Sequence, residues 1–245
     1  MRLPADWIAP EWPAPSRVHA FVTTRNGGVS AGPYTNLNLG LRVGDDPDDV
    51  ARNRQRVRVL LPSEPKWLQQ VHGTTALDAA NIQGEPIADA AFTRARRVVC
   101  TVQTADCLPI LLCDLAGTVV ASVHAGWRGL ASGVIERTVE ATRCPASTLM
   151  GWLGPAIGPS AFEVGPDVLE AFARTDSQAS SAFVPLREGR YLADLFALAR
   201  RRLVALGVGQ VFGGGFCTYS DASRFFSHRR DRITGRQAAF IWLGD

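Results

Sequence analysis

The sequence predicts an α+β fold in which strands form layers beneath helices. Predicted strands outnumber predicted helices, yet several stretches carry the periodicity of amphipathic helices. The two kinds of element do not alternate strictly, as a doubly wound fold would require. The chain has 245 residues, of which 46% are hydrophobic and 20% charged, which is typical of a globular protein. One domain can accommodate that length.

The first third of the chain begins irregularly. Residues 1–16 combine acids, prolines and tryptophans, and we expect an irregular N-terminal segment there. Residues 18–25 predict a strand, and residues 26–40 a turn-rich loop with four glycines and a proline. Residues 45–61 open with aspartates and a proline and then become periodic, which predicts a helix with an acidic first turn. Residues 66–73 predict a short strand.

The rest of the chain is dominated by apolar, β-branched stretches and amphipathic segments. Three stretches predict neighbouring buried strands: 97–104, 109–114 and 118–125. Further strands are expected over 148–155, 211–218 and 238–243. Helices are expected over 129–143, 165–174 and 191–207, the last closed by Gly207.

Cysteine usage and the absence of export signals in the sequence predict a soluble cytoplasmic protein. Five cysteines at irregular spacing do not form a disulfide framework. The N-terminus lacks the apolar core of a signal peptide, and no apolar run approaches the roughly 18 residues of a membrane span. We therefore expect no membrane partner, and a monomer or weak homodimer.

Charge does not indicate a nucleic-acid partner. The formal net charge is only +3. Arginine clusters at 52–58 and 200–202 lie on predicted helices, where solvated faces explain them. No aromatic residues are interleaved with them to stack on bases.

Histidine and cysteine supply a candidate metal site. The chain has four histidines, and two of them, His72 and His124, stand beside glycine at the ends of predicted strands. Cys107 lies between them in sequence. Two imidazoles and one thiolate suit zinc, and three protein ligands leave one coordination position open. The gaps of 35 and 17 residues match no short metal motif, so core histidines and a buried inert thiol remain the alternative.

A wider pattern of motifs resembles a known family. The motifs occur in order from residue 18 to 243: FVTTRNGGVS, QQVHG, ADAAFT, TADCLPI, HAGWRG, GPAIGPSAFEVG and FFSHRRDRITGRQAAFIWL. They are similar to those of the laccase-domain family. It is also called the multicopper polyphenol oxidase-like family or peptidoglycan editing factor, and its members include purine nucleoside phosphorylases.

The resemblance implies a fold, a metal site and an activity. The fold is a single domain over 1–245, with stacked mixed sheets flanked by helices in an α/β/β/α sandwich. The implied metal is zinc, bound by His72, Cys107 and His124. The implied activity is phosphorolysis of adenosine, inosine and methylthioadenosine, with adenosine deamination as a second reaction. The substrates are therefore purine nucleosides and phosphate. Ser160 departs from the pattern, since some relatives carry cysteine there.

Asp106 joins Cys107 and His124 as an expected catalytic residue. It could act as a general acid or orient a histidine, provided that the chain turns there, as Pro109 suggests. A surface aspartate is the alternative.

Substrate-binding candidates lie in several motifs. Arg25 precedes a glycine pair whose backbone N–H groups can approach an anion, so it could bind phosphate or cap a turn. Arg128 could bind phosphate or stabilise its own turn, and we favour the structural role. Asn38 and Gln70 are candidates for hydrogen bonds to substrate.

Three other functions are weighed against phosphorolysis. Four histidines cannot supply the type 1 and trinuclear sites of a four-copper laccase, which excludes that mechanism, although adventitious copper could replace zinc. Cys107 and His124 could instead form a nucleophilic pair that hydrolyses an amide of a peptidoglycan precursor. A non-catalytic protein with a structural zinc would need a fourth ligand, from Cys100, Cys113 or His228. We interpret His228 as a packing residue, because relatives often carry tyrosine there.

Overall fold

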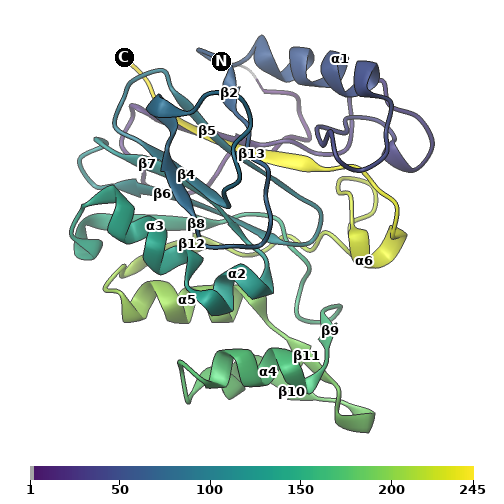
Figure 1. Cartoon of the computed structure of the whole chain (residues 1–245), viewed down its shortest axis with the longest axis vertical. Helices are drawn as coiled ribbons and strands as arrows, with labels where there is room; N and C mark the ends of the chain where they lie inside the picture. The colour runs from purple at the N-terminus through teal and green to yellow at the C-terminus, as the bar shows by residue number, and fades with distance from the viewer. Residues whose placement is uncertain (1–2) are drawn as a thin grey trace.

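Two stacked sheets form the centre of the molecule, and the computed structural model describes residues 3–245 (Figure 1). The four-stranded sheet has the order β1 (Val18–Val22), β13 (Gln237–Leu243), β5 (Val99–Thr104) and β2 (Pro65–Lys66). The six-stranded sheet has the order β12 (Gln210–Gly213), β8 (Leu149–Leu153), β6 (Leu108–Asp114), β7 (Val120–Ala125), β4 (Ala90–Thr93) and β3 (Ala76–Asp78). Both sheets mix parallel and antiparallel pairs.

Helices cover the outer faces of both sheets. Those that do are α1 (Pro47–Arg58), α2 (Trp127–Ser132), α3 (Val134–Thr142) and α5 (Leu195–Ala205). Two further helices, α4 (Pro166–Ala173) and α6 (His228–Asp231), lie away from these faces. Figure 1 shows α1 on the side of the four-stranded sheet and α2, α3 and α5 below the six-stranded sheet. No helix within residues 3–245 combines the length and the apolar character that crossing a bilayer requires.

The burial pattern of β13 shows why the sandwich has three apolar layers. Ala239 and Ile241 face the core between the sheets, while Phe240 and Trp242 face the layer beneath α1. Successive side chains of a strand point to opposite faces. A strand that is covered on both faces therefore has a continuous run of apolar residues in its sequence. A third apolar layer lies between the six-stranded sheet and α3 and α5. The predicted α+β class and α/β/β/α layering are confirmed.

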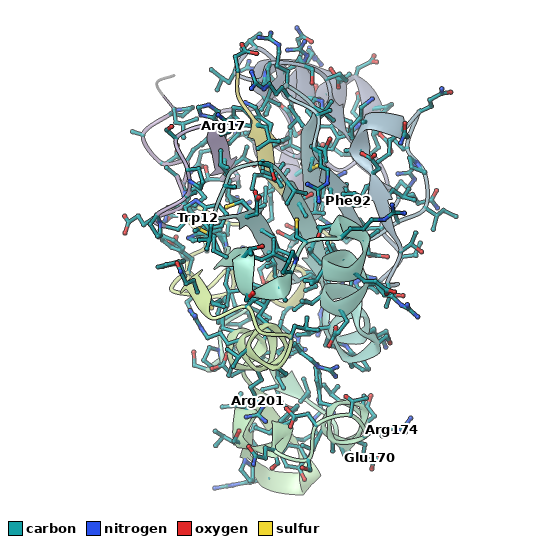
Figure 2. The ribbon with its side chains drawn as sticks, turned by 90° about the vertical axis from the view of Figure 1, so that its left-hand side faces the viewer. Trp12, Arg17, Phe92, Glu170, Arg174 and Arg201 are labelled. Carbon is teal, nitrogen blue, oxygen red and sulfur yellow. The ribbon has the colours of Figure 1, made fainter. Side chains whose placement is uncertain are left out.

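A small lobe extends from this sandwich. It holds α4 and a three-stranded sheet in the order β10 (Phe183–Pro185), β11 (Tyr191–Ala193) and β9 (Glu163–Val164). Arg201 of α5 joins the lobe to the sandwich, donating to both carboxylate oxygens of Asp176 at 2.7 and 2.8 Å. Figure 2 shows Arg201 at the junction, with Arg174 and Glu170 farther out on the lobe.

Four predicted elements differ from the observed ones. The strand expected over 211–218 ends at Gly213 as β12. The helix expected over 129–143 is two helices, because Gly133 between them has φ of +96°. The helix expected over 191–207 begins only at Leu195, where Asp194 caps it by accepting from the Ala197 N–H. The strand expected over 66–73 is limited to β2, and the rest of that range is loop. Sequence analysis did not predict β3, β4, β9, β10, β11 or α6.

The Phe240 ring is expected to carry much of the packing beneath α1. It is fully buried, 5.0 Å from the Phe21 ring and 5.8 Å from the Trp67 ring, measured between centroids. We expect Phe240→Ala to lower the free energy of unfolding by about 3–5 kcal/mol in urea titrations. Val59→Ala, at a residue 70% exposed, is the control and should change it by less than about 0.5 kcal/mol. Equal midpoints for the two variants would contradict this account of the packing.

Candidate metal centre

His72, Cys107 and His124 converge from three separate segments. His72 lies on the loop after β2, Cys107 in the turn between β5 and β6, and His124 on β7. The Cys107 Sγ and His72 Nε2 atoms are 3.6 Å apart, and all three ligand atoms lie within 4.8 Å of one another. The imidazole centroids are 4.9 Å apart in an edge-to-face arrangement.

A buried carboxylate, that of Asp89, orients both histidines. It is fully buried and accepts from the backbone N–H groups of His72 at 2.9 Å and Gly73 at 2.6 Å. It also lies 2.8 Å from Nδ1 of His124, which leaves Nε2 of that ring to face Cys107 and His72. Burial opposes the charge on Asp89, but the bond to His124 and the backbone donors outweigh it and lower the pKa of the carboxyl.

Sequence analysis did not single out Asp89, although it lies in the ADAAFT motif. A charged residue between alanines in an apolar stretch is a usable signal, because a buried charge requires partners.

Two glycines of the HAGWRG motif allow the close approach. A Cβ on Gly126 would lie 2.6 Å from Cδ2 of His72 and 2.9 Å from Sγ of Cys107. A Cβ on Gly129 would lie 2.9 Å from the carbonyl oxygen of Gly73. Side chains at either position would push the His72 loop away from β7, so the start of α2 carries none there.

The Cys107 thiol and the His124 imidazole favour each other's charged forms. Burial opposes ionisation of the thiol, but the charge of His124 and hydrogen bonds from both histidines lower the pKa of Cys107 to about 6. Burial likewise opposes protonation of His124, yet the Cys107 and Asp89 charges raise its pKa to about 9. Both shifts favour the thiolate–imidazolium form of the metal-free site, and a metal ion would displace the imidazolium proton.

The three ligand atoms open into a cationic cavity of about 440 Å³. Arg42, Arg128 and Arg236 line it, and its described lining residues include no aspartate or glutamate. Arg128 stacks over the Trp127 ring at 4.3 Å, and Arg42 pairs with Glu85 at 2.8 Å. Such a surface suits an anionic ligand.

Arg236 is the most firmly positioned of the three arginines. Its backbone N–H donates to the Asn38 side chain at 2.8 Å, and its Nη1 donates to the carbonyls of Thr234 and Gly235. Its stem packs where Gly40 leaves room, since a Cβ there would be 2.7 Å from the Arg236 Cγ. Burial lowers the pKa of its guanidinium, while the charges of Cys107 and Asp106 raise it.

Two of the predicted substrate residues line the cavity, and the other two bond the loops around it. Gln70 and Arg128 line the cavity, but both polar atoms of the Gln70 amide bond the backbone of Gln103 at 2.7 Å. Arg25 lies outside it and donates to the carbonyls of Thr35 and Ala222. Asn38 is fully buried and bonds Gly40, Asp45 and Arg236. Geometry thus gives Arg25 the turn-stabilising role that the sequence left open.

Asp106 turns away from the cluster. Its φ is +89°, so the chain does turn at this point, as Pro109 suggested. Its carboxylate accepts from the Thr218 hydroxyl and from the Arg229 backbone N–H, both at 2.6 Å. Asp106 therefore contacts a neighbouring loop rather than a ligand atom.

The interpretation of His228 as a packing residue is wrong. Its side chain is exposed and lines the cavity. The two other proposed fourth ligands, Cys100 and Cys113, are fully buried in the core between the sheets, where burial raises the pKa of both thiols. Ser160 is exposed and lies outside the cluster.

Known proteins are similar to this chain in sequence over nearly its whole length. The chain is 53% identical over 244 residues to a purine nucleoside phosphorylase of Pseudomonas aeruginosa, covering 98% of this chain and 99% of that protein. It is 52% identical over 242 residues to the purine nucleoside phosphorylase YfiH of Escherichia coli, covering 96% and 98%.

Solved structures with the same fold are also similar to this chain in sequence. A Neisseria meningitidis protein superposes with a TM-score of 0.95 at 50% identity, covering 98% of this chain and all of that one. YlmD from Geobacillus stearothermophilus superposes with a TM-score of 0.87 at 31% identity, covering 94% and 93%. A family model described as multi-copper polyphenol oxidoreductase laccase matches residues 19–244. The chain therefore belongs to the multi-copper polyphenol oxidoreductase laccase family.

Proposed function

We propose that this protein is a zinc-dependent purine nucleoside phosphorylase that acts on adenosine, inosine and methylthioadenosine, with adenosine deamination as a side reaction. The observation that carries the proposal is the His72–Cys107–His124 cluster at the wall of a cationic cavity. Relatives about half identical over nearly the whole chain bear the name purine nucleoside phosphorylase, which supports the reaction class.

The donor set fits zinc. One thiolate and two imidazoles are borderline-soft ligands, and Asp89 holds Nδ1 of His124 so that Nε2 is directed to the cluster. Bound zinc would supply a Lewis acid that neutralises charge on a substrate oxygen. Copper could occupy the same donors adventitiously.

The chain's own residues would bind and orient phosphate. Arg236 and Arg128 line the cavity, and guanidinium geometry matches phosphate oxygens. No carboxylate among the described lining residues repels an anion. Binding phosphate beside a nucleoside in one cavity would hold the attacking oxygen close to the C1′ carbon.

The oxidase in the family description is not the reaction we propose. A four-copper laccase needs a type 1 site and a trinuclear cluster, and the chain has four histidines in all. One of these, His19, stacks on Trp242 in the four-stranded sheet, with ring centroids 5.4 Å apart.

Amide hydrolysis is the second candidate. Cys107 Sγ lies 3.6 Å from a His72 nitrogen, and a thiol beside imidazoles is also the arrangement of a cysteine nucleophile. Phosphate dependence separates the two reactions, because amide hydrolysis consumes no phosphate.

The zinc site predicts metal content. Purified protein should carry about one zinc per chain, and His72→Ala, Cys107→Ala and His124→Ala should lose most of it because each removes a ligand. Asp89→Asn should weaken zinc binding about 10–100-fold through the orientation of both histidines. Cys144→Ala, which removes a thiol outside the cluster, is the matched control for elemental analysis. Full zinc in all three ligand variants would refute the site.

The cavity predicts phosphate-dependent chemistry. With adenosine, the zinc-loaded protein should yield adenine and ribose 1-phosphate only when phosphate is present, and inosine would report the deaminase reaction. Arg236→Gln should raise the KM for phosphate about tenfold or more, since it removes a charged donor. Arg174→Gln, on the outer lobe, should leave it unchanged (Figure 2). If no ribose 1-phosphate forms at saturating adenosine and phosphate, the proposed reaction is ruled out.

The thiolate predicts a pH-dependent alkylation. In protein stripped of metal with a chelator, the rate at which iodoacetamide labels Cys107 should rise with pH, with a midpoint near pH 6. The reactive thiolate is present above that pKa and lost below it. His124→Ala should move the midpoint upward by removing the imidazolium, and zinc should protect the thiol. Peptide mass spectrometry gives the rates, with buried Cys113 as the internal unlabelled control. A midpoint above pH 8 in the unaltered chain would be inconsistent with the pair.

A further inference from the structure

The His228 imidazole shares the cavity with the three candidate metal ligands. It is the first residue of α6, its side chain is exposed, and it lines the same 440 Å³ space as His72, Cys107 and His124. The four-residue helix that carries it is capped by Ser227 and bonded to Asp106 through the Arg229 N–H.

Side-chain oxygens fix the backbone around His228. Asp106, which is 8% exposed, accepts from the Arg229 N–H at 2.6 Å while also bonding the Thr218 hydroxyl. The Ser227 hydroxyl accepts from the Arg230 N–H at 3.2 Å. Asp106 thereby ties the residue after His228 to the β5–β6 turn, while Ser227 caps the short helix that His228 begins.

The two arginines that follow His228 are engaged elsewhere. Arg229 donates to the Glu163 carbonyl at 2.8 Å and covers the Phe162 ring at 5.4 Å. Arg230 donates to the carbonyls of Thr218, Tyr219 and Phe225. Of the three adjacent side chains His228, Arg229 and Arg230, only His228 lines the cavity.

The cavity offers few groups that can give up a proton. Its ionisable described lining residues are three arginines, the three candidate metal ligands and His228. Guanidinium groups keep their protons at neutral pH, and the ligand atoms are committed to the metal. Imidazole is the side chain whose ordinary titration range allows proton transfer near neutrality.

Breaking a purine N-glycosidic bond calls for such a proton. The electron pair of the C1′–N9 bond leaves with the base, and an anionic purine is a poor leaving group. Protonation at N7 lets the base depart neutral.

We propose that His228 is the catalytic acid that protonates N7 of the leaving purine. The inference rests on the proposed phosphorylase function. A phosphate oxygen forms the new bond to C1′ as the C1′–N9 bond breaks, and the imidazolium proton moves to N7. The proton lost by the attacking hydrogenphosphate restores the imidazolium, so the reaction needs no other reagent. Asp106 is a positioning residue that acts through His228.

The test compares inosine with 7-methylinosine, whose N7 already carries a methyl group and a positive charge. Its base leaves neutral without a proton, and inosine avoids the deaminase reaction. We expect His228→Gln to lower kcat/KM for inosine about 10²–10⁴-fold and to leave 7-methylinosine nearly unchanged. Asp106→Ala should lower the inosine to 7-methylinosine ratio in the same direction. His19→Gln, an exposed imidazole outside the cavity, is the matched control.

Each other outcome overturns the inference in a distinct way. Unchanged inosine turnover in His228→Gln, or an equal loss on both substrates, refutes proton donation while leaving phosphorolysis intact. If the unaltered protein phosphorolyses neither substrate, both the proposed function and the role of His228 as its acid are refuted. Retained 7-methylinosine turnover by His228→Gln also shows that the variant is folded and metal-loaded.

Discussion

The buried carboxylate of Asp89 is the constraint on which the candidate metal centre depends. A charge removed from water is tolerated only when donors surround it, and Asp89 receives three backbone N–H groups from residues 71–73 and the His124 ring. The same carboxylate therefore anchors the His72 loop and selects the free nitrogen of His124. The backbone N–H of His124 also donates to the backbone carbonyl of Asp89 at 2.7 Å, which ties this arrangement to the pairing of β4 with β7.

The layered sheets explain why the remaining groups meet at one end of the molecule. β5 and β6 belong to different sheets, and the turn between them carries Asp106 and Cys107. That turn directs Cys107 toward the histidines and Asp106 toward the loop before α6. One crossing between sheets thus positions a candidate metal ligand and, through Arg229, the helix that carries His228.

The composition of the cavity reconciles the family description with the proposed chemistry. A single cluster of three soft and borderline donors lies beside three arginines, with no acidic side chain among the described residues of the lining. Electron transfer through several copper ions would require many more imidazoles. A wall of arginines next to a donor set that fits one Lewis-acidic ion would instead suit the phosphate-dependent transfer that we propose.

Local sequence determined the class of fold and the buried strands β5 to β8 and β13, which follow from apolar runs and turn residues readable within a few positions. The three clustered donors were predicted from the resemblance of motifs spread over residues 18–243, because their spacing alone matches no short metal motif. Only the tertiary structure placed Asp89, Arg236 and His228 beside the cluster or its cavity, and placed Arg25 and Asn38 outside the described cavity lining. Whether a polar side chain reaches a cavity depends on strand register and on partners 100 or more residues away, as Asp106 and Arg229 show. Such long-range pairings leave no periodic trace in the sequence.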